Sequence, residues 1–203
     1  MKKIMIGVAA AIIAASASFA ESGNPSEWYI AGSIGQAEYD LSLSDFADID
    51  DGSITSASLD DSDTSYSLYG GFRINQYFAV EGGYLDLGES SLSAQSDGSE
   101  LYFAGPLNLV AEVDGFNIGG KGIIPINEKF ELFAKLGVYM WDAEAKVKNG
   151  AVSESDDENG SDAYYALGGT FLVGQISINA EYALYELEDV DVENISVGLQ
   201  YAF

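Results

Sequence analysis

The sequence of 203 residues contains no cysteine and no histidine, and it has only 8 lysines and arginines against 33 aspartates and glutamates. Without cysteine, no disulfide framework can stabilise the fold. Without histidine, the chain lacks the commonest general base and the commonest transition-metal ligand. A formal net charge of -25 makes nucleic acid an implausible partner. We therefore expect neither an enzyme nor a nucleic-acid-binding protein, and neither a cofactor nor a resident metal.

The longest apolar run is too short for a membrane-spanning helix. It extends from Ile4 to about Ala17, follows two lysines and precedes the small residues of the segment 18–20. A helical span needs ~20 apolar residues, whereas this pattern of charge, apolar run and small residues is typical of a secretory signal. We predict that residues 1–20 form a signal peptide and that residues 21–203 form one exported domain.

Period-two alternation of apolar residues recurs throughout the mature chain, and no long segment shows helical periodicity. The pattern predicts eight strands, at about 27–37, 64–74, 77–87, 109–125, 129–143, 163–173, 175–187 and 193–203.

The expected connections alternate in length. Three are tight turns, while those at the opposite end are the loops at about 38–63, 88–108 and 144–162 and a shorter one at 188–192. An even strand count with short turns at one end and long loops at the other is typical of outer membrane barrels. The sequence predicts an all-β fold, an eight-stranded antiparallel up-and-down transmembrane β-barrel with its long loops outside the cell.

The polar faces of the predicted strands distinguish a membrane barrel from a soluble one. In the strand at 77–87, Phe78, Val80 and Tyr84 share one face, whereas the other carries small residues and a lone charge, Glu81. Small residues with single charges fit the narrow interior of an eight-stranded barrel, and buried charges must be paired. We predict an interior ion-pair network of five residues: Arg73, Glu81, Lys121, Lys135 and Glu181.

Aromatic residues gather near both ends of the predicted strands, as the two aromatic belts at membrane interfaces do. One group is Trp28, Tyr77, Phe78, Phe130, Tyr201 and Phe203, and the other is Tyr66, Tyr84, Trp141, Tyr165 and Tyr185. Trp28 and Trp141 are accordingly predicted to be interface aromatics.

Several segments resemble the OmpA-like outer membrane beta-barrel family, namely FRINQYFAVEGGYLDLG at 72–88, WYIAGSIGQAEY, GGKGIIPI, FAKLGVYMWDAE and NAEYALYE. The resemblance implies residence in the bacterial outer membrane, with outer membrane lipid and lipopolysaccharide as partners. It also implies a salt-bridge network that blocks the lumen, to which Glu81, Lys121 and Glu181 correspond, with Lys135 as another interior base. The last predicted strand offers no arginine where the family carries one, and we expect the barrel domain alone, without the peptidoglycan-binding domain of many relatives.

The chain end also resembles the family pattern. Its polar residue, glycine and two apolar residues are Ser196, Gly198, Tyr201 and Phe203. In the family, this pattern is read by the barrel assembly machinery, so the resemblance implies that these residues form an insertion signal.

The expected loops carry most of the acidic residues, which leaves divalent cations as partners to consider. DIDDGS from Asp48 departs from a calcium loop because its glycine is fifth and no glutamate is twelfth, so solvated loops are the simpler interpretation. We expect a structural outer membrane protein with a salt-bridged lumen, which displays acidic loops for envelope integrity or surface contact. A small passive pore and an adhesin or phage receptor are the alternatives.

Overall fold

The computed structural model of the protein describes residues 27–46, 52–100, 102–150, 152–188 and 190–203. The predicted signal peptide lies outside this range. The described elements are β1 (Glu27–Tyr39), the 3-10 helix η1 (Leu43–Phe46), β2 (Ile54–Asp60), β3 (Ser62–Asn75), β4 (Phe78–Ser96), β5 (Gly105–Asn127), β6 (Phe130–Asn149), β7 (Val152–Val173), β8 (Ile176–Leu187) and β9 (Val190–Ala202).

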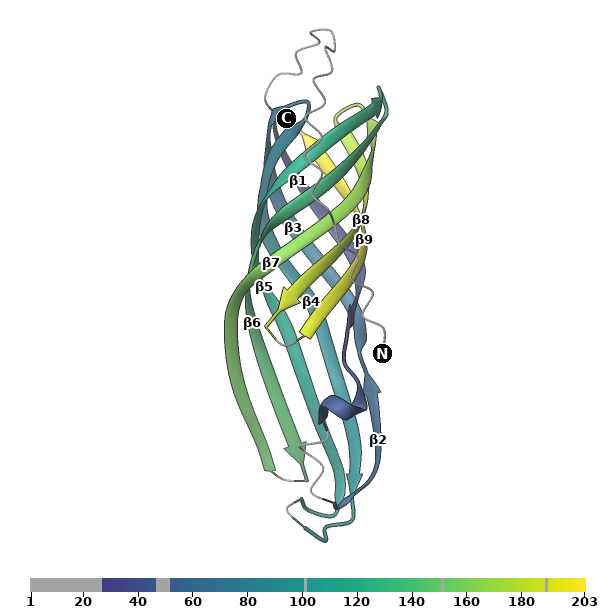
Figure 1. Cartoon of the computed structure of the whole chain (residues 1–203), viewed down its shortest axis with the longest axis vertical. Helices are drawn as coiled ribbons and strands as arrows, with labels where there is room; N and C mark the ends of the chain where they lie inside the picture. Colours follow the sequence, from purple (N-terminus) through teal and green to yellow (C-terminus); the bar gives the residue numbers. More distant parts are fainter. Residues whose placement is uncertain (1–26, 47–51, 101, 151, 189) are drawn as a thin grey trace.

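Eight of the nine strands close into a ring (Figure 1). Their order is β4-β3-β1-β9-β8-β7-β6-β5, and β5 pairs again with β4. All neighbours are antiparallel, and the first and last strands pair from Tyr29 opposite Ala202 to Tyr39 opposite Val192. The predicted fold, an eight-stranded up-and-down barrel, is confirmed.

None of the helical structure in the described part of the chain has the length and apolar content that a membrane crossing by a helix requires.

The ring places its apolar residues on the outside. In β4, Phe78 and Val80 are 58% and 44% exposed, whereas Ala79 and Glu81 between and beside them are buried. Since successive side chains of a strand point to opposite faces, the alternation in the sequence assigns one set to the outer wall and the other to the interior. An exposed apolar wall around a polar interior is the arrangement that a lipid bilayer requires.

Three tight connections define one end of the ring, which we call the turn end; it lies at the top of Figure 1. Two of these turns are held by asparagine side chains that accept backbone hydrogen bonds. Asn75 Oδ1 accepts from the amides of Tyr77 and Phe78 at 2.8 and 3.0 Å, and Asn127 Oδ1 accepts from the amide of Lys129 at 2.9 Å. Such asparagine turns explain why these strands reverse where they do.

At the other end, four strands continue past the ring and form an extension with β2, seen at the bottom of Figure 1. The extension comprises 54–60, 88–96, 105–113, 142–149 and 152–161 in the sheet order β2-β4-β5-β6-β7. Most residues of the loops expected at 88–108 and 144–162 are therefore strand, and the loop expected at 38–63 contains β2 as a ninth strand.

The physical reason is clearest in the β7 part of the extension, which has lost the alternation of the ring. Residues 152–159 of β7 are exposed on both faces, yet they pair with β6 in continuous register from Asn149 opposite Val152 to Asp142 opposite Asn159. Backbone hydrogen bonds hold this part of the sheet, and a pattern search for apolar residues does not detect it.

Candidate functional site

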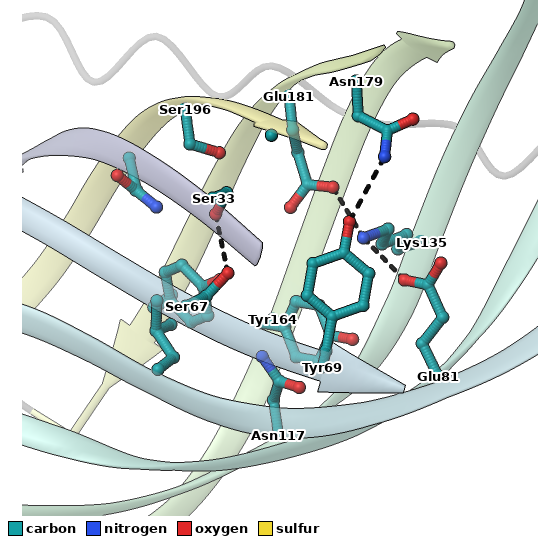
Figure 2. A pocket seen from close by; sticks show the side chains of 14 residues that line it. Ser33, Ser67, Tyr69, Glu81, Asn117, Lys135, Tyr164, Asn179, Glu181 and Ser196 are labelled. Carbon is teal, nitrogen blue, oxygen red and sulfur yellow. Dashed lines mark hydrogen bonds and ion pairs between the residues drawn. The ribbon is translucent and has the colours of Figure 1, made fainter. Parts of the chain in front are cut away.

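The interior of the ring contains an ionic layer built around Glu81 on β4. Its carboxylate contacts the ammonium groups of Lys121 on β5 at 3.0 Å and of Lys135 on β6 at 2.6 Å. Tyr29 on β1 donates its hydroxyl to the same carboxylate at 2.6 Å. Lys135 also contacts Glu181 on β8 at 2.7 Å, so that it lies between two carboxylates, as Figure 2 shows.

The two lysines of the ionic layer are further supported by aromatic rings. The ammonium of Lys121 lies 4.2 Å from the ring centroid of Phe133, and that of Lys135 lies 4.8 Å from the ring centroid of Tyr69. A cation over an aromatic face is stabilised when it is shielded from water. With two lysines and two glutamates, the layer is charge-balanced, which is the condition for burying such groups.

A second ion pair is separate from the ionic layer. Arg73 on β3 binds Glu131 on β6 through two hydrogen bonds, at 3.0 and 2.6 Å, and both side chains are buried. The structure thus divides the five predicted interior residues into a group of four and Arg73 alone. Glu131 was missed because it lies beside a turn, yet it shares the inward face of its strand with Phe133 and Lys135.

A small cavity adjoins the ionic layer and has a volume of about 30 Å³. Its lining includes Lys135, Glu181, Asn117 and a pair of serines, Ser33 and Ser67, whose hydroxyls are 2.6 Å apart (Figure 2). A cavity needs roughly 10–15 Å³ to hold one water molecule. This space suits one or two waters and is far smaller than a solute-conducting lumen.

An aromatic layer lies in the interior between the ionic layer and the extension. We define it as Tyr39, Tyr139, Trp141, Tyr164 and Tyr185, all buried and packed with buried aliphatic residues such as Leu85 and Leu87. The ring centroids of Tyr185 lie 5.1 Å from Tyr139 and 5.5 Å from Tyr164. This layer was not recognised in the sequence, where Trp141 and Tyr185 were assigned to an outer belt.

Trp141 is the main correction to the predicted residues. It was expected at the membrane interface, but its side chain is 5% exposed inside the ring, where Nε1 donates a hydrogen bond to Asp162 Oδ2 at 2.6 Å. The reason is its register, because Trp141 shares the inward face of β6 with Lys135. Tyr185 is inside for the same reason. Trp28, in contrast, is 59% exposed on the outer wall and packs against Phe72.

The four residues of the expected insertion signal lie on both faces of β9. Ser196 is buried and faces the interior, whereas Tyr201 and Phe203 are exposed on the outer wall with their rings 6.4 Å apart. Gly198 lies where an added Cβ would come within 2.8 Å of a β1 carbonyl oxygen, that of Gly32. The chain end is tied to β1, since the amide of Phe203 donates to the carbonyl of Trp28 at 3.0 Å.

Carboxylates form rows across the outer face at the extended end. Asp86, Asp114 and Asp142 lie directly opposite one another on neighbouring strands, and Glu89, Glu112, Glu144 and Asp157 form a second row. Lys146 donates a hydrogen bond to Glu144 at 2.7 Å, and this bond raises the pKa of the lysine. Like charges placed opposite each other destabilise a sheet, so the rows are not explained by folding alone.

The charged groups of the ionic layer are paired with one another, since each of its carboxylates contacts a lysine. Among the described residues, no group of three or more acidic side chains is placed to hold a metal ion.

One relative in sequence and two solved structures are similar to this chain. Outer membrane protein A of Escherichia fergusonii is 23% identical over 156 residues, which cover 77% of this chain and 39% of that protein; the chain thus spans about two fifths of its length. The attachment invasion locus protein Ail of Yersinia pestis is 20% identical, with a TM-score of 0.52 over 88% of this chain and 97% of Ail. Neisserial surface protein A is 13% identical, with a TM-score of 0.52 over 88% of this chain and 99% of that one.

The two solved structures agree with this chain in fold. The family comparison is more specific. The sequence model of the family of OmpA-like transmembrane domains matches residues 24–203, which include every strand of the ring. The chain therefore belongs to the family of OmpA-like transmembrane domains and resides in the bacterial outer membrane.

Proposed function

We propose that this protein is a structural outer membrane barrel whose salt-bridged interior is sealed and whose extension faces the outside of the cell. The observation that carries the proposal is the filling of the interior at two successive levels. The ionic layer occupies the ring around Glu81 and Lys135, and the aromatic layer fills it nearer the extension. The cavity beside the ionic layer measures only about 30 Å³.

The orientation rests on the two unequal ends. Outer membrane barrels have short turns on the periplasmic side and longer connections outside the cell. The turn end, with its three tight connections, corresponds to the periplasmic side, and the extension corresponds to the outside. The acidic rows of the extension then lie in water, where their mutual repulsion is weakened by solvent and salt.

A small passive pore is the alternative function, and it makes the opposite prediction in planar bilayers. Ion passage would require both layers to open, because each one occupies the lumen by itself. We expect purified wild-type protein to show no discrete openings at physiological salt. Frequent openings in the wild type, with a size that changes in Glu81→Gln, would overturn the sealed-barrel proposal and favour the pore.

Surface contact is the second role we propose, through the extension. The name of Ail describes an attachment and invasion protein, and Ail has also been solved with the heparin analogue sucrose octasulfate. A polysulfated ligand needs cations, whereas the extension of this chain carries rows of carboxylates, so we propose contact with neutral or basic surfaces instead. A variant with a shortened 88–108 segment should lose binding to host cells or phage while its barrel still migrates in heat-modifiable form.

Assembly into the membrane is proposed to depend on the barrel assembly machinery, which would read Ser196, Gly198, Tyr201 and Phe203. Tyr201 and Phe203 are exposed on the outer wall, next to the seam where β9 meets β1. Residues 48–51 of the segment DIDDGS lie outside the described residues, and within the described ranges no group of three or more acidic side chains is placed to hold a metal ion, so calcium is not part of the proposal. Absence of heat on calorimetric titration with calcium is the expected result.

A further inference from the structure

The first half of β7 is an open edge of the extension. Residues 152–163 pair with β6 on one side, whereas pairing with β8 on the other side begins only at Tyr164, opposite Tyr185. β8 ends at Leu187, and β6 and β7 continue past it toward the bottom of Figure 1. Within the described ranges, neither the strand pairings nor the remaining backbone hydrogen bonds occupy the second side of 152–163. We call this segment the free edge.

The free edge keeps the regular geometry that pairing with a further strand requires. Its register with β6 runs from Val152 opposite Asn149 to Ala163 opposite Val138 without a shift. In an antiparallel pair, alternate residues direct their amide and carbonyl groups to the neighbouring strand, so the others present theirs on the open side. Natural proteins usually shorten, bulge or cover such edges, because they bind other strands. This edge is long and unbulged, and its residues 152–159 are exposed.

The side chains of the free edge are acidic or uncharged. Three carboxylates at alternate positions, Glu154, Asp156 and Glu158, share one face of the strand, with about 6.7 Å between successive ones. This face continues the barrel interior, since Glu158 lies opposite Ala143, which packs against the buried cluster that contains the aromatic layer. The free edge contains no lysine or arginine that could neutralise these carboxylates.

Charge and backbone chemistry together select the occupant of the free edge. A second copy of the same edge would place carboxylates opposite carboxylates, which destabilises strand pairing. The other edge strand of the extension, β2, contains no lysine or arginine either, so a second copy offers no basic edge. A free cation would leave the open backbone groups unpaired. An extended peptide with basic residues satisfies the backbone groups and the carboxylates at once.

We propose that the free edge of β7 binds an extended basic segment of another protein by β-strand addition. Lysine or arginine at every second residue of that segment would lie against Glu154, Asp156 and Glu158, because both strands have the same period of two. The proposal deepens the surface contact proposed above by naming its strand and its class of partner. It rests on that proposed function and on the orientation that places the extension outside the cell.

The first test uses synthetic peptides and the purified barrel in detergent micelles. The probe is a fluorescent peptide of alternating lysine and threonine, about ten residues long, whose binding is measured by anisotropy. A block peptide has the same composition, with all lysines before all threonines, and a third peptide is the alternating one with its backbone amides methylated. We expect the alternating peptide to bind about tenfold more tightly than either control, because only it matches both the charges and the backbone.

The second test compares two triple variants with the same change in charge. The edge variant neutralises the three carboxylates of the free edge, as Glu154→Gln, Asp156→Asn and Glu158→Gln. The control variant neutralises three exposed or half-buried carboxylates on β4 and β5, which have strand neighbours on both sides, as Glu89→Gln, Glu112→Gln and Asp114→Asn. The edge variant should bind the alternating peptide about tenfold more weakly, the effect of losing three exposed charge pairs, and the control less than about twofold more weakly.

Hydrogen exchange locates the bound peptide. The alternating peptide should slow amide exchange in 152–163, where open backbone groups become paired, and leave the ring unchanged. Equal binding of the alternating and block peptides, or equal weakening by both triple variants, would overturn the proposal, since general attraction between opposite charges would then suffice. Absence of binding to the wild type would also overturn it and would leave the carboxylates only the task of keeping copies apart.

Heat-modifiable migration shows whether each triple variant is folded. If the edge variant fails this check, the comparison of the three peptides on the wild type decides. The surface-contact proposal is judged separately, because its variant shortens 88–108, which belongs to β4 and β5 and leaves the free edge in place. Loss of cell or phage binding in that variant, together with no peptide binding in the wild type, would refute the role of β7 alone.

Discussion

Replacing Lys135 by methionine should destabilise the barrel more than replacing Lys121 in the same way. Lys135 is the only lysine of the ionic layer that contacts both carboxylates, at 2.6 Å to Glu81 and 2.7 Å to Glu181. In Lys135→Met, three charged groups remain, with Glu181 deprived of the cation it contacts. Removal of one partner of a buried ion pair costs about 3–5 kcal/mol.

In Lys121→Met, both carboxylates of the ionic layer still contact Lys135. Glu81 keeps its contact with Lys135 at 2.6 Å and its hydrogen bond from Tyr29, also at 2.6 Å. The loss then approaches that of one hydrogen bond to a charged group, about 1.5–3 kcal/mol. Both substitutions keep an unbranched apolar stem of similar length, so the difference between them reports charge rather than packing.

A double variant separates charge from position. Lys135→Met with Glu181→Gln returns the layer to one lysine and one glutamate, Lys121 and Glu81, which remain in contact at 3.0 Å. It should recover part of the stability lost in Lys135→Met, by about 1–2 kcal/mol, because no carboxylate is left unmatched. The free energy of unfolding is measured by urea titration in lipid vesicles, followed by tryptophan fluorescence.

Equal destabilisation by Lys135→Met and Lys121→Met would refute the assignment of Lys135 as the bridging cation. A double variant less stable than Lys135→Met would refute the charge-balance argument as well. Loss of the heat-modifiable band in Lys135→Met would mean that the cost exceeds the total stability, in which case Lys135→Arg is the informative variant, since it keeps the charge.

Three further predictions concern other parts of the ring. Glu131→Gln should cost about 3 kcal/mol in the same urea titration, since it leaves the Arg73 guanidinium buried beside a neutral amide. Brominated lipids should strongly quench the fluorescence of Trp141→Phe, which retains Trp28 on the outer wall, and weakly quench that of Trp28→Phe; equal quenching would contradict the interior position of Trp141. Deletion of Phe203 should slow assembly in cells far more than it destabilises the refolded barrel, and normal outer membrane levels would contradict the insertion signal.

The ring could be predicted from the sequence because lipid imposes a simple rule on every strand that crosses it. Phe78, Val80 and Tyr84 alternate with small or charged residues, and this alternation assigned Glu81 to the interior. The same alternation places Lys121, Lys135 and Glu181 inside, and the structure brings them together.

The alternation of inward and outward residues could not predict which interior side chains pair or how deep in the ring each one lies. Arg73 and Glu131 both satisfy the rule for interior residues, but their pairing depends on how far β3 and β6 are shifted along the ring, which no single strand records. Trp141 also follows this alternation and belongs to the inward set of its strand. It was assigned to an aromatic belt because it lies near a predicted strand end. The extension escaped detection because water on both sides of β7 removes the need for apolar alternation.

The interior contacts determine how far the strands are shifted along the ring relative to one another. Sheet hydrogen bonds join only neighbouring strands, whereas Glu81 and Lys135 join β4 to β6, Lys135 and Glu181 join β6 to β8, and Arg73 and Glu131 join β3 to β6. A slip of two residues in β6 would keep its apolar face toward lipid but move Lys135 and Glu131 along the lumen, away from their partners. Polar pairs across the lumen therefore select one register for the whole ring, which backbone pairing and a uniformly apolar outer wall cannot do. The sealing that we propose is a separate task, and we assign it to the aromatic layer, whose rings pack on one another nearer the extension.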